Sequence, residues 1–191
     1  EVQILFTHDM HSHLDSYKAE KEGETVKVGG FGKLKTLVDE KRKNCPATFL
    51  LDGGDFSMGT LYQTIYETEA AELVQMGRLG YDATTLGNHE FDYRSSGLAH
   101  MLHAAIKRGE EERELKLPAL VSANIDWTKN TSKDNKLVKE ALDAYGSTPY
   151  IVLERGGVRV GIYGVLGKDA DACAPESGLE FEDIVETSKK W

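Results

Sequence analysis

The chain has 191 residues, of which 40% are hydrophobic and 29% are charged, a balance typical of a folded domain rather than a disordered segment. Its formal net charge of −9 argues against a nucleic-acid polymer as its partner, because such binding depends on clustered Lys and Arg. No apolar run approaches the roughly 18 residues of a membrane span, so the sequence predicts no transmembrane segment. Only two cysteines occur, Cys45 and Cys173, which excludes a dense disulfide framework and leaves open whether these two pair.

The first half of the chain alternates short apolar segments with amphipathic ones. Short β-branched and aromatic runs predict buried strands, and apolar residues at helical spacing predict helices. Residues 16–27 are polar and are expected to form a connection. The strands are expected at 2–7, 47–51 and 82–86, and the helices at 31–43 and 68–79.

The second half of the chain continues this alternation and then changes to a hairpin pattern. Leu98 to Ile106 repeat at helical spacing, which predicts a helix that Gly109 can end. A charged connection (110–116), a strand (119–123) and a polar excursion with at most one short helix (124–147) are expected next. Alternating residues on both sides of Gly156 and Gly157 then predict a β-hairpin over 150–165. The whole pattern predicts an α/β fold in which a mostly parallel sheet and a second sheet pack as a sandwich flanked by helices.

The first strand delivers a polar motif, T-H-D-M-H-S-H, at residues 7–13. Side chains two residues apart on an extended segment point the same way, so Asp9, His11 and His13 would share one face if the strand continued that far. A carboxylate beside imidazoles suits Zn, Mn or Fe, whereas all-oxygen sites suit Mg and Ca. Taken alone, this motif fits a metal site and a polar surface loop equally well.

Two further motifs follow the next two predicted strands. G-G-D at 53–55 and G-N-H-E at 87–90 each fit a polar turn when taken alone. Ligands of parallel sheets gather at the carboxyl ends of the strands, and all three motifs are expected there. Their joint occurrence therefore favours one shared site over three separate turns.

The three motifs in this order, with D-M-H at 9–11, resemble those of the calcineurin-like metallophosphoesterases. F-D-Y at 91–93, S-A-N at 122–124 and V-G-I-Y-G-V at 160–165 are similar to the branch of 5'-nucleotidases and 2',3'-cyclic-nucleotide phosphodiesterases. The resemblance implies a four-layer αββα sandwich, incomplete at the C-terminus, and the hydrolysis of nucleotides or related phosphate esters.

The resemblance also implies a centre of two divalent ions (Mn, Zn, Mg or Fe). Asp9 and His11 match ligands of the first metal, Asp55 matches the carboxylate that bridges both metals, and Asn88 matches a ligand of the second. Two such cations activate a water and clamp the phosphoryl oxygens during in-line attack.

Two residues match the proton-transfer machinery of the family. His89 matches the residue that stabilises the transition state and protonates the leaving oxygen, and Asp92 matches the carboxylate that orients it. Histidine suits this role because its pKa lies near neutrality.

Several residues depart from the family pattern. His8 and Ser12 stand where Asn and Gly are more usual, Arg94 stands where Gly is usual, and neither His8 nor His13 matches a ligand. His8 and His13 are therefore expected to be loop residues near the site. His100 and His103 are expected on the surface of their helix.

Family members complete the metal centre with three further histidines, and this chain has no histidine after His103. They also carry a C-terminal domain that selects the substrate. Residues 1–191 are therefore expected to be the N-terminal portion of a catalytic domain, with the C-terminal domain of the same parent chain as its partner and little activity of their own. An extracellular, periplasmic or cell-surface location is what the resemblance implies.

Two other functions remain open from the residues themselves. D-M-H-S-H also resembles the H-x-H that opens the metal-dependent amidohydrolases, with His11 and His13 as ligands, although this leaves G-G-D and G-N-H-E without a role. A non-catalytic module that keeps the fold is the third alternative, and the presence of all the site residues argues against it.

Overall fold

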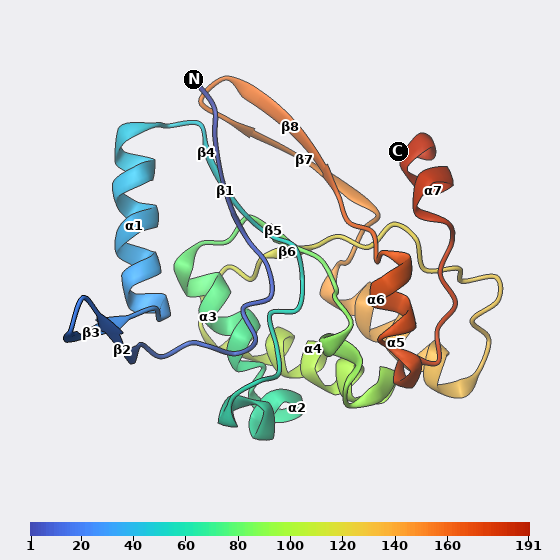
Figure 1. Ribbon diagram of the computed structural model, residues 1–191. Helices are drawn as coiled ribbons and strands as arrows, with labels where there is room; N and C mark the ends of the chain where they lie inside the picture. Colours follow the sequence, from blue (N-terminus) through green and yellow to red (C-terminus); the bar gives the residue numbers. More distant parts are fainter.

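The computed structural model describes residues 1–191, and its centre is a four-stranded parallel sheet (Figure 1). The strand order is β1-β4-β5-β6. After β1, each strand of this sheet is reached by a crossover connection and pairs with the strand of the sheet that precedes it in the chain. The carboxyl ends of these strands meet at one edge, as the sequence predicts. The strands are β1 (Gln3–Thr7), β4 (Thr48–Asp52), β5 (Ala83–Thr84) and β6 (Ala119–Leu120).

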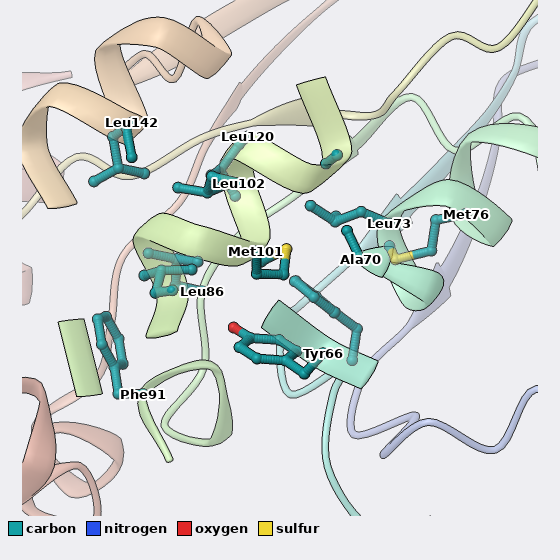
Figure 2. Close-up of a cluster of buried hydrophobic side chains, with 14 of the residues drawn as sticks. Tyr66, Ala70, Leu73, Met76, Leu86, Phe91, Met101, Leu102, Leu120 and Leu142 are labelled. Carbon is teal, nitrogen blue, oxygen red and sulfur yellow. The ribbon is translucent and has the colours of Figure 1, made fainter. Parts of the chain in front are cut away.

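Helices cover one face of the sheet and enclose the main hydrophobic core. The core contains side chains from the sheet and from the helices that cover it, including Leu120 of β6, Leu73 of α3 and Met101 of α4 (Figure 2). All three side chains are almost completely buried. The helices are α1 (Phe31–Asn44), α3 (Ala71–Leu79), α4 (Arg94–Glu111) and α5 (Lys133–Tyr145).

A second sheet consists of the antiparallel hairpin of β7 (Tyr150–Arg155) and β8 (Val158–Tyr163). Gly156 and Gly157 form its turn with φ values of 60° and 75°, which residues without a Cβ adopt at no steric cost. The guanidinium of Arg155 lies over the ring of Phe49 in β4, 5.3 Å from the ring centroid. The predicted combination of a parallel sheet, a second sheet and flanking helices is confirmed.

Strand β1 lies at the edge of the parallel sheet and is less covered than its neighbour. Ile4 and Phe6, which point away from the helices, are 54% and 60% exposed. A groove of about 440 Å³ separates these side chains from Ile162 and Tyr163 of β8. The hairpin therefore covers β4 more completely than it covers β1.

One pair of strands was not expected from the sequence. The polar segment 16–27 forms a hairpin of β2 (Tyr17–Lys21) and β3 (Glu24–Val28). Glu22 and Gly23 form its turn with positive φ values of 54° and 82°, the backbone of a tight two-residue turn. Most side chains of this hairpin are exposed, so the apolar alternation that indicates a strand is weak here.

The helical segments differ from the expectations in three places. The single helix expected over 68–79 is broken at Ala70 (φ 45°) into α2 (Tyr66–Glu69) and α3. Helix α4 continues past Gly109, where ion pairs from Arg108 to Glu111 and Glu112 support its last turn. The polar excursion contains a helix of 13 residues, α5, rather than a short one.

The remaining elements are short and flank the sandwich. Both cysteines are free, Cys45 being buried and Cys173 exposed. None of the helices combines the length and the apolar character needed to cross a membrane. The short elements are η1 (Leu61–Ile65), η2 (His89–Phe91), α6 (Lys168–Ala172), η3 (Pro175–Ser177) and α7 (Ile184–Lys190).

Candidate metal centre

The first and second motifs lie side by side where β1 and β4 end. The amides of Asp9, His11 and Ser12 donate hydrogen bonds to the carbonyl oxygens of Gly54, Asp55 and Phe56 at 3.1, 3.0 and 2.9 Å. These bonds continue the pairing of β1 with β4 beyond the ends of both strands. These three hydrogen bonds fix the distance between the backbones of the D-M-H and G-G-D motifs.

The strand does not continue far enough for Asp9, His11 and His13 to share one face, which was the condition of that expectation. Strand β1 ends at Thr7, and Asp9 and His11 have φ values of 50° and 46°, so the extended geometry stops before the motif. These left-handed turns bring His11 Nε2 to 3.6 Å from Asp9 Oδ1. His13 turns back into its own loop, where its Nδ1 hydrogen-bonds to the Met10 carbonyl at 3.1 Å.

His8 contacts the candidate ligand Asp9 directly. Its Nδ1 hydrogen-bonds to Asp9 Oδ2, and this bond is the largest influence on the pKa of Asp9, which is lowered despite some desolvation. His8 itself is exposed. His8, which departs from the family pattern, is therefore a neighbour that holds the carboxylate of Asp9 in place.

Glycines allow the second and third motifs to touch. A Cβ on Gly87 would lie 2.2 Å from Asp55 Oδ1, and one on Gly54 would lie 2.6 Å from the Gly87 nitrogen. Both distances are shorter than any normal contact of a side-chain carbon, so Gly54 and Gly87 are needed for this approach. At this point Asp55 Oδ1 accepts a hydrogen bond from the His89 amide at 2.8 Å.

Asn88 and His89 stand at the start of η2, next to both other motifs. Asn88 makes no capping hydrogen bond with its side chain, which leaves its amide oxygen available as a ligand. The ring of His89 contacts that of His11 edge to face, with centroids 4.8 Å apart. All three motifs therefore meet around His89.

Asp92 lies within hydrogen-bond distance of the His89 ring. The Nδ1 of His89 lies 3.0 Å from Asp92 Oδ2. Partial burial acts to lower the pKa of His89, but the hydrogen bond and charge of Asp92, together with Asp55 and Glu90, outweigh it and raise that pKa.

Glu90 is a further site residue, and its type and position in the sequence predict no particular role for it. It is fully buried, and its carboxylate accepts hydrogen bonds from the amides of Asp55, Gly87 and Ser57 and from the Ser57 hydroxyl. Burial raises the pKa of Glu90 to about 7, against the effect of these donors. Glu90 thus links the second motif to the third. The sequence signal that could have identified it is its place as the last residue of G-N-H-E.

Asp52 ties three strands together directly below the motifs. Its carboxylate accepts hydrogen bonds from Thr7 of β1 at 2.7 Å and from Thr84 of β5 at 2.9 Å, and also from the Gly54 amide at 3.0 Å. Burial raises the pKa of Asp52, and these hydrogen bonds oppose the rise. The sequence gives only a weak signal for this link: a polar residue ends a buried strand, and threonines stand at the matching positions of the neighbouring strands.

Arg94 occupies a backbone conformation that favours glycine. Its φ is 64°, which explains why Gly is usual at this position in the resembling family. Its exposed side chain pairs with Glu176 at 3.1 Å. His100 and His103 lie on the exposed side of α4, as expected, and His100 contacts Glu67 at 2.6 Å.

The donors at the strand ends fit a divalent transition metal in chemical type. Two carboxylates, an imidazole and an amide oxygen, from Asp9, Asp55, His11 and Asn88, form a mixed nitrogen and oxygen set that suits Mn, Zn or Fe. No three His, Cys, Asp or Glu side chains converge on one point as ligands would. The side chains of Asp9, His11, Asp55 and Asn88 thus have the chemical character of metal ligands.

Comparison with known proteins agrees with the arrangement of the motifs. The chain is 36% identical to the 5'-nucleotidase of Rattus norvegicus over 190 residues, which cover 97% of this chain and 30% of that protein. It is 30% identical to the probable 5'-nucleotidase of Treponema pallidum, covering all of this chain and 29% of that protein. The chain therefore spans about a third of the length of these curated relatives.

Solved structures give the same picture. The 5'-nucleotidase precursor from Thermus thermophilus is 31% identical and superposes with a TM-score of 0.76, covering 99% of this chain and 33% of that one. The NAD nucleotidase of Haemophilus influenzae is 25% identical, with a TM-score of 0.71 and coverage of 99% and 31%. These matches, and the position of His13 in its own loop, overturn the amidohydrolase alternative. The family model of the calcineurin-like phosphoesterases matches residues 2–171, and the chain therefore belongs to that family.

Proposed function

We propose that the parent protein is a metal-dependent phosphoester hydrolase of the 5'-nucleotidase type, which acts on nucleotides or related phosphate esters. The observation that carries this proposal is the position of His89. Its ring is held by Asp92 and contacts His11, while its amide is bonded to Asp55. The names of the relatives, which are 5'-nucleotidases and an NAD nucleotidase, support the substrate class.

Calcineurin-like phosphoesterases use a dinuclear metal centre. We propose Asp9, His11, Asp55 and Asn88 as its ligands in this chain, with Mn, Zn, Fe or Mg as the metal. Two divalent cations bound there would lower the pKa of a water and neutralise charge on the phosphoryl oxygens.

His89 is proposed to protonate the leaving oxygen of the substrate. Because Asp92 engages Nδ1, the other ring nitrogen, Nε2, is the one left to face the substrate. The raised pKa of His89 keeps a larger share of the imidazole protonated near neutrality, as a general acid requires.

A hollow beside the motifs offers space for a ligand. It has a volume of about 570 Å³, which lies within the range of ordinary ligand sites, and it is lined by His8, Asp9 and Lys33. It borders Asp9 but is not lined by Asp55, Asn88 or His89, so it adjoins the place of the proposed reaction and does not enclose it.

Residues 1–191 are proposed to be the N-terminal portion of the catalytic domain, and a C-terminal domain of the same parent chain is proposed to select the substrate. The coverage of about 30% of the relatives and the lack of histidines after His103 support this proposal. We therefore expect the chain to bind metal weakly and to hydrolyse substrates slowly. An extracellular, periplasmic or cell-surface location belongs to the same proposal.

The test measures Mn²⁺ binding by calorimetry and phosphate release from AMP, with excess chelator as the blank. Asp55→Ala should abolish detectable Mn²⁺ binding. His89→Asn should retain Mn²⁺ binding but reduce the residual hydrolysis by about 100-fold, the usual contribution of a general acid. His103→Ala, which changes an exposed histidine on α4, is the matched control and should behave as wild type.

Equal hydrolysis by His89→Asn and wild type would overturn the role of His89. Mn²⁺ binding without any hydrolysis, either here or in a parent chain that includes the missing histidines, would favour the non-catalytic module. Rapid hydrolysis by the 191-residue chain alone would contradict the proposal that its centre is incomplete.

A further inference from the structure

The loop that carries Asp9 and His11 has an unfavourable backbone conformation. Asp9, His11 and Ser12 have φ values of 50°, 46° and 56°, a region that residues other than glycine seldom adopt. Such residues persist only where the surrounding contacts over-determine them, and they cluster at functional sites. The contacts that hold this loop therefore decide how His11 is presented.

Most of these contacts come from the neighbouring motif segment. Besides the three backbone bonds to residues 54–56, the Ser12 carbonyl accepts a hydrogen bond from Thr60 Oγ1 at 2.9 Å. Gly59 passes so close that a Cβ there would lie 2.9 Å from the His11 carbonyl oxygen. All of these partners belong to the chain that follows β4.

A buried side-chain contact also reaches the loop from helix α3. The Ser12 hydroxyl donates a hydrogen bond of 2.6 Å to Glu72 Oε1, in the first turn of helix α3. Both side chains are about 99% buried. This bond is therefore shielded from water and links the loop to a helix that carries none of the candidate ligands.

A carboxylate is an unfavourable choice for packing at this position. The second oxygen of Glu72, Oε2, is buried and has no hydrogen-bond partner, and burial raises the pKa of Glu72. The neighbouring buried positions of α3 carry apolar residues such as Leu73 and Met76. An apolar side chain at position 72 would pack in the core without burying a carboxyl group. The acid is therefore better explained by its bond to Ser12 than by the packing of α3.

We propose that Glu72 is a positioning residue that acts through Ser12 to hold the left-handed turn of His11, and so to aim its imidazole at the metal. This inference rests on the proposed metal centre. Outer contacts of this kind typically change metal affinity by about 10- to 100-fold.

The test compares the Mn²⁺ affinity and the thermal unfolding of four variants of the chain. Ser12→Ala removes the donor and should weaken Mn²⁺ binding about 10-fold. Glu72→Gln keeps an oxygen that can accept from Ser12 and should bind Mn²⁺ within about 3-fold of wild type. Glu72→Leu removes the acceptor and should match Ser12→Ala if it folds. Ser95→Ala is the control, because it removes the hydrogen bond of another buried serine, to the Ser177 carbonyl, far along the chain in α4.

The outcomes separate this inference from the proposed function. Loss of Mn²⁺ binding in Asp55→Ala, with unchanged binding in Ser12→Ala, would overturn the role of Glu72 and leave the metal centre in place. A fall in thermal stability in Ser12→Ala without a change in affinity would show that the contact is only structural. Absence of Mn²⁺ binding by the wild-type chain would overturn the metal centre and this inference together.

Discussion

The carboxylate of Glu90 accepts four hydrogen bonds, two on each of its oxygens. In Glu90→Gln one of these oxygens becomes an NH₂ group, which would face donors and leave at least two buried N–H or O–H groups unpaired. Since each unpaired group costs about 1 to 3 kcal/mol, we expect a loss of about 3 kcal/mol in the free energy of unfolding, measured in urea at about pH 5. Because the pKa of Glu90 is raised to about 7, wild type is neutral at that pH, and the loss should shrink as the pH rises through 7.

Glu72→Gln is the matched control for this prediction. Glu72 is equally buried but accepts a single hydrogen bond, and its other oxygen has no donor to lose. We expect a change within about 1 kcal/mol. Equal losses in the two variants would mean that burial alone, and not the number of donors, sets the importance of Glu90.

The backbone of Arg94 allows a second prediction at the scale of one residue. Its φ of 64° disfavours any residue with a Cβ, and both Arg94→Gly and Arg94→Ala lose the ion pair with Glu176. The glycine variant should therefore be more stable than the alanine variant by about 1 kcal/mol, by urea unfolding. Inside an ordinary helix the order would be reversed by a similar amount. An alanine variant as stable as the glycine variant would argue against the left-handed conformation.

At the scale of elements, Arg155 fastens the β7–β8 hairpin to the parallel sheet. Its guanidinium donates two bonds to the Asp82 carboxylate, at 2.5 and 3.0 Å, and one to the Thr48 carbonyl at 2.6 Å. Asp82 also accepts a bond from the Leu50 amide at 2.8 Å. The hairpin is thus bonded to residues in or beside β4 and β5.

Arg155→Ala should lower the free energy of unfolding by about 2 kcal/mol, less than for a fully buried pair because Arg155 is partly exposed. Amide hydrogen exchange should rise first in β7 and β8, since the hairpin loses its anchor. Arg159→Ala, an exposed arginine on the same hairpin, should change neither quantity. Uniform exchange throughout the chain would indicate that the hairpin and the sheet unfold together.

The sequence predicted elements well where their apolar pattern is strong. The buried run of β4 and the alternation on both sides of Gly156 and Gly157 identified a core strand and a hairpin within two residues of their observed limits. The β2–β3 hairpin and helix α5 were underestimated because their faces are mostly polar. Strand β5 has only two residues, since its pairing with both neighbours ends sooner than its apolar composition suggests.

The same distinction applies to the site. Residue types and their order along the chain pointed to Asp9, Asp55 and His89, and the structure brings their motifs together. The turn at His11 depends on backbone bonds to residues 54–56, and the buried bond of Ser12 reaches Glu72, 60 residues away along the chain. No local sequence pattern records contacts between segments so far apart. The roles of Asp9 and Asp55 as metal ligands and of His89 as proton donor remain predictions, which the binding and hydrolysis assays test.

At the scale of the whole molecule, buried acids make the stability depend on pH. Burial raises the pKa of Asp52 and of Glu72 above the values of an unfolded chain, so the folded state holds these protons more tightly. Their contribution to stability is complete below about pH 4 and is lost as the pH rises through the raised pKa values. The nearby Tyr62 and Tyr66 stay protonated in this range, since an ordinary tyrosine has a pKa of about 10 and the pKa values of these two are raised further.

We therefore expect Glu72→Gln to gain stability relative to wild type as the pH rises from 4 to 8. Urea unfolding at several pH values, with a chelator present, measures this difference. A difference that stays constant with pH would show that Glu72 keeps the same charge in the folded and unfolded states.

The free edge of β1 has a consequence for the colloidal behaviour of the chain. A strand that is paired on one side only, with exposed Ile4 and Phe6, offers a template on which the backbone of a second copy can add. The net charge of −9 opposes this stacking, and dissolved salt screens the repulsion over about 10 Å at 0.1 M. Low ionic strength is accordingly the condition that keeps concentrated solutions of this chain dispersed.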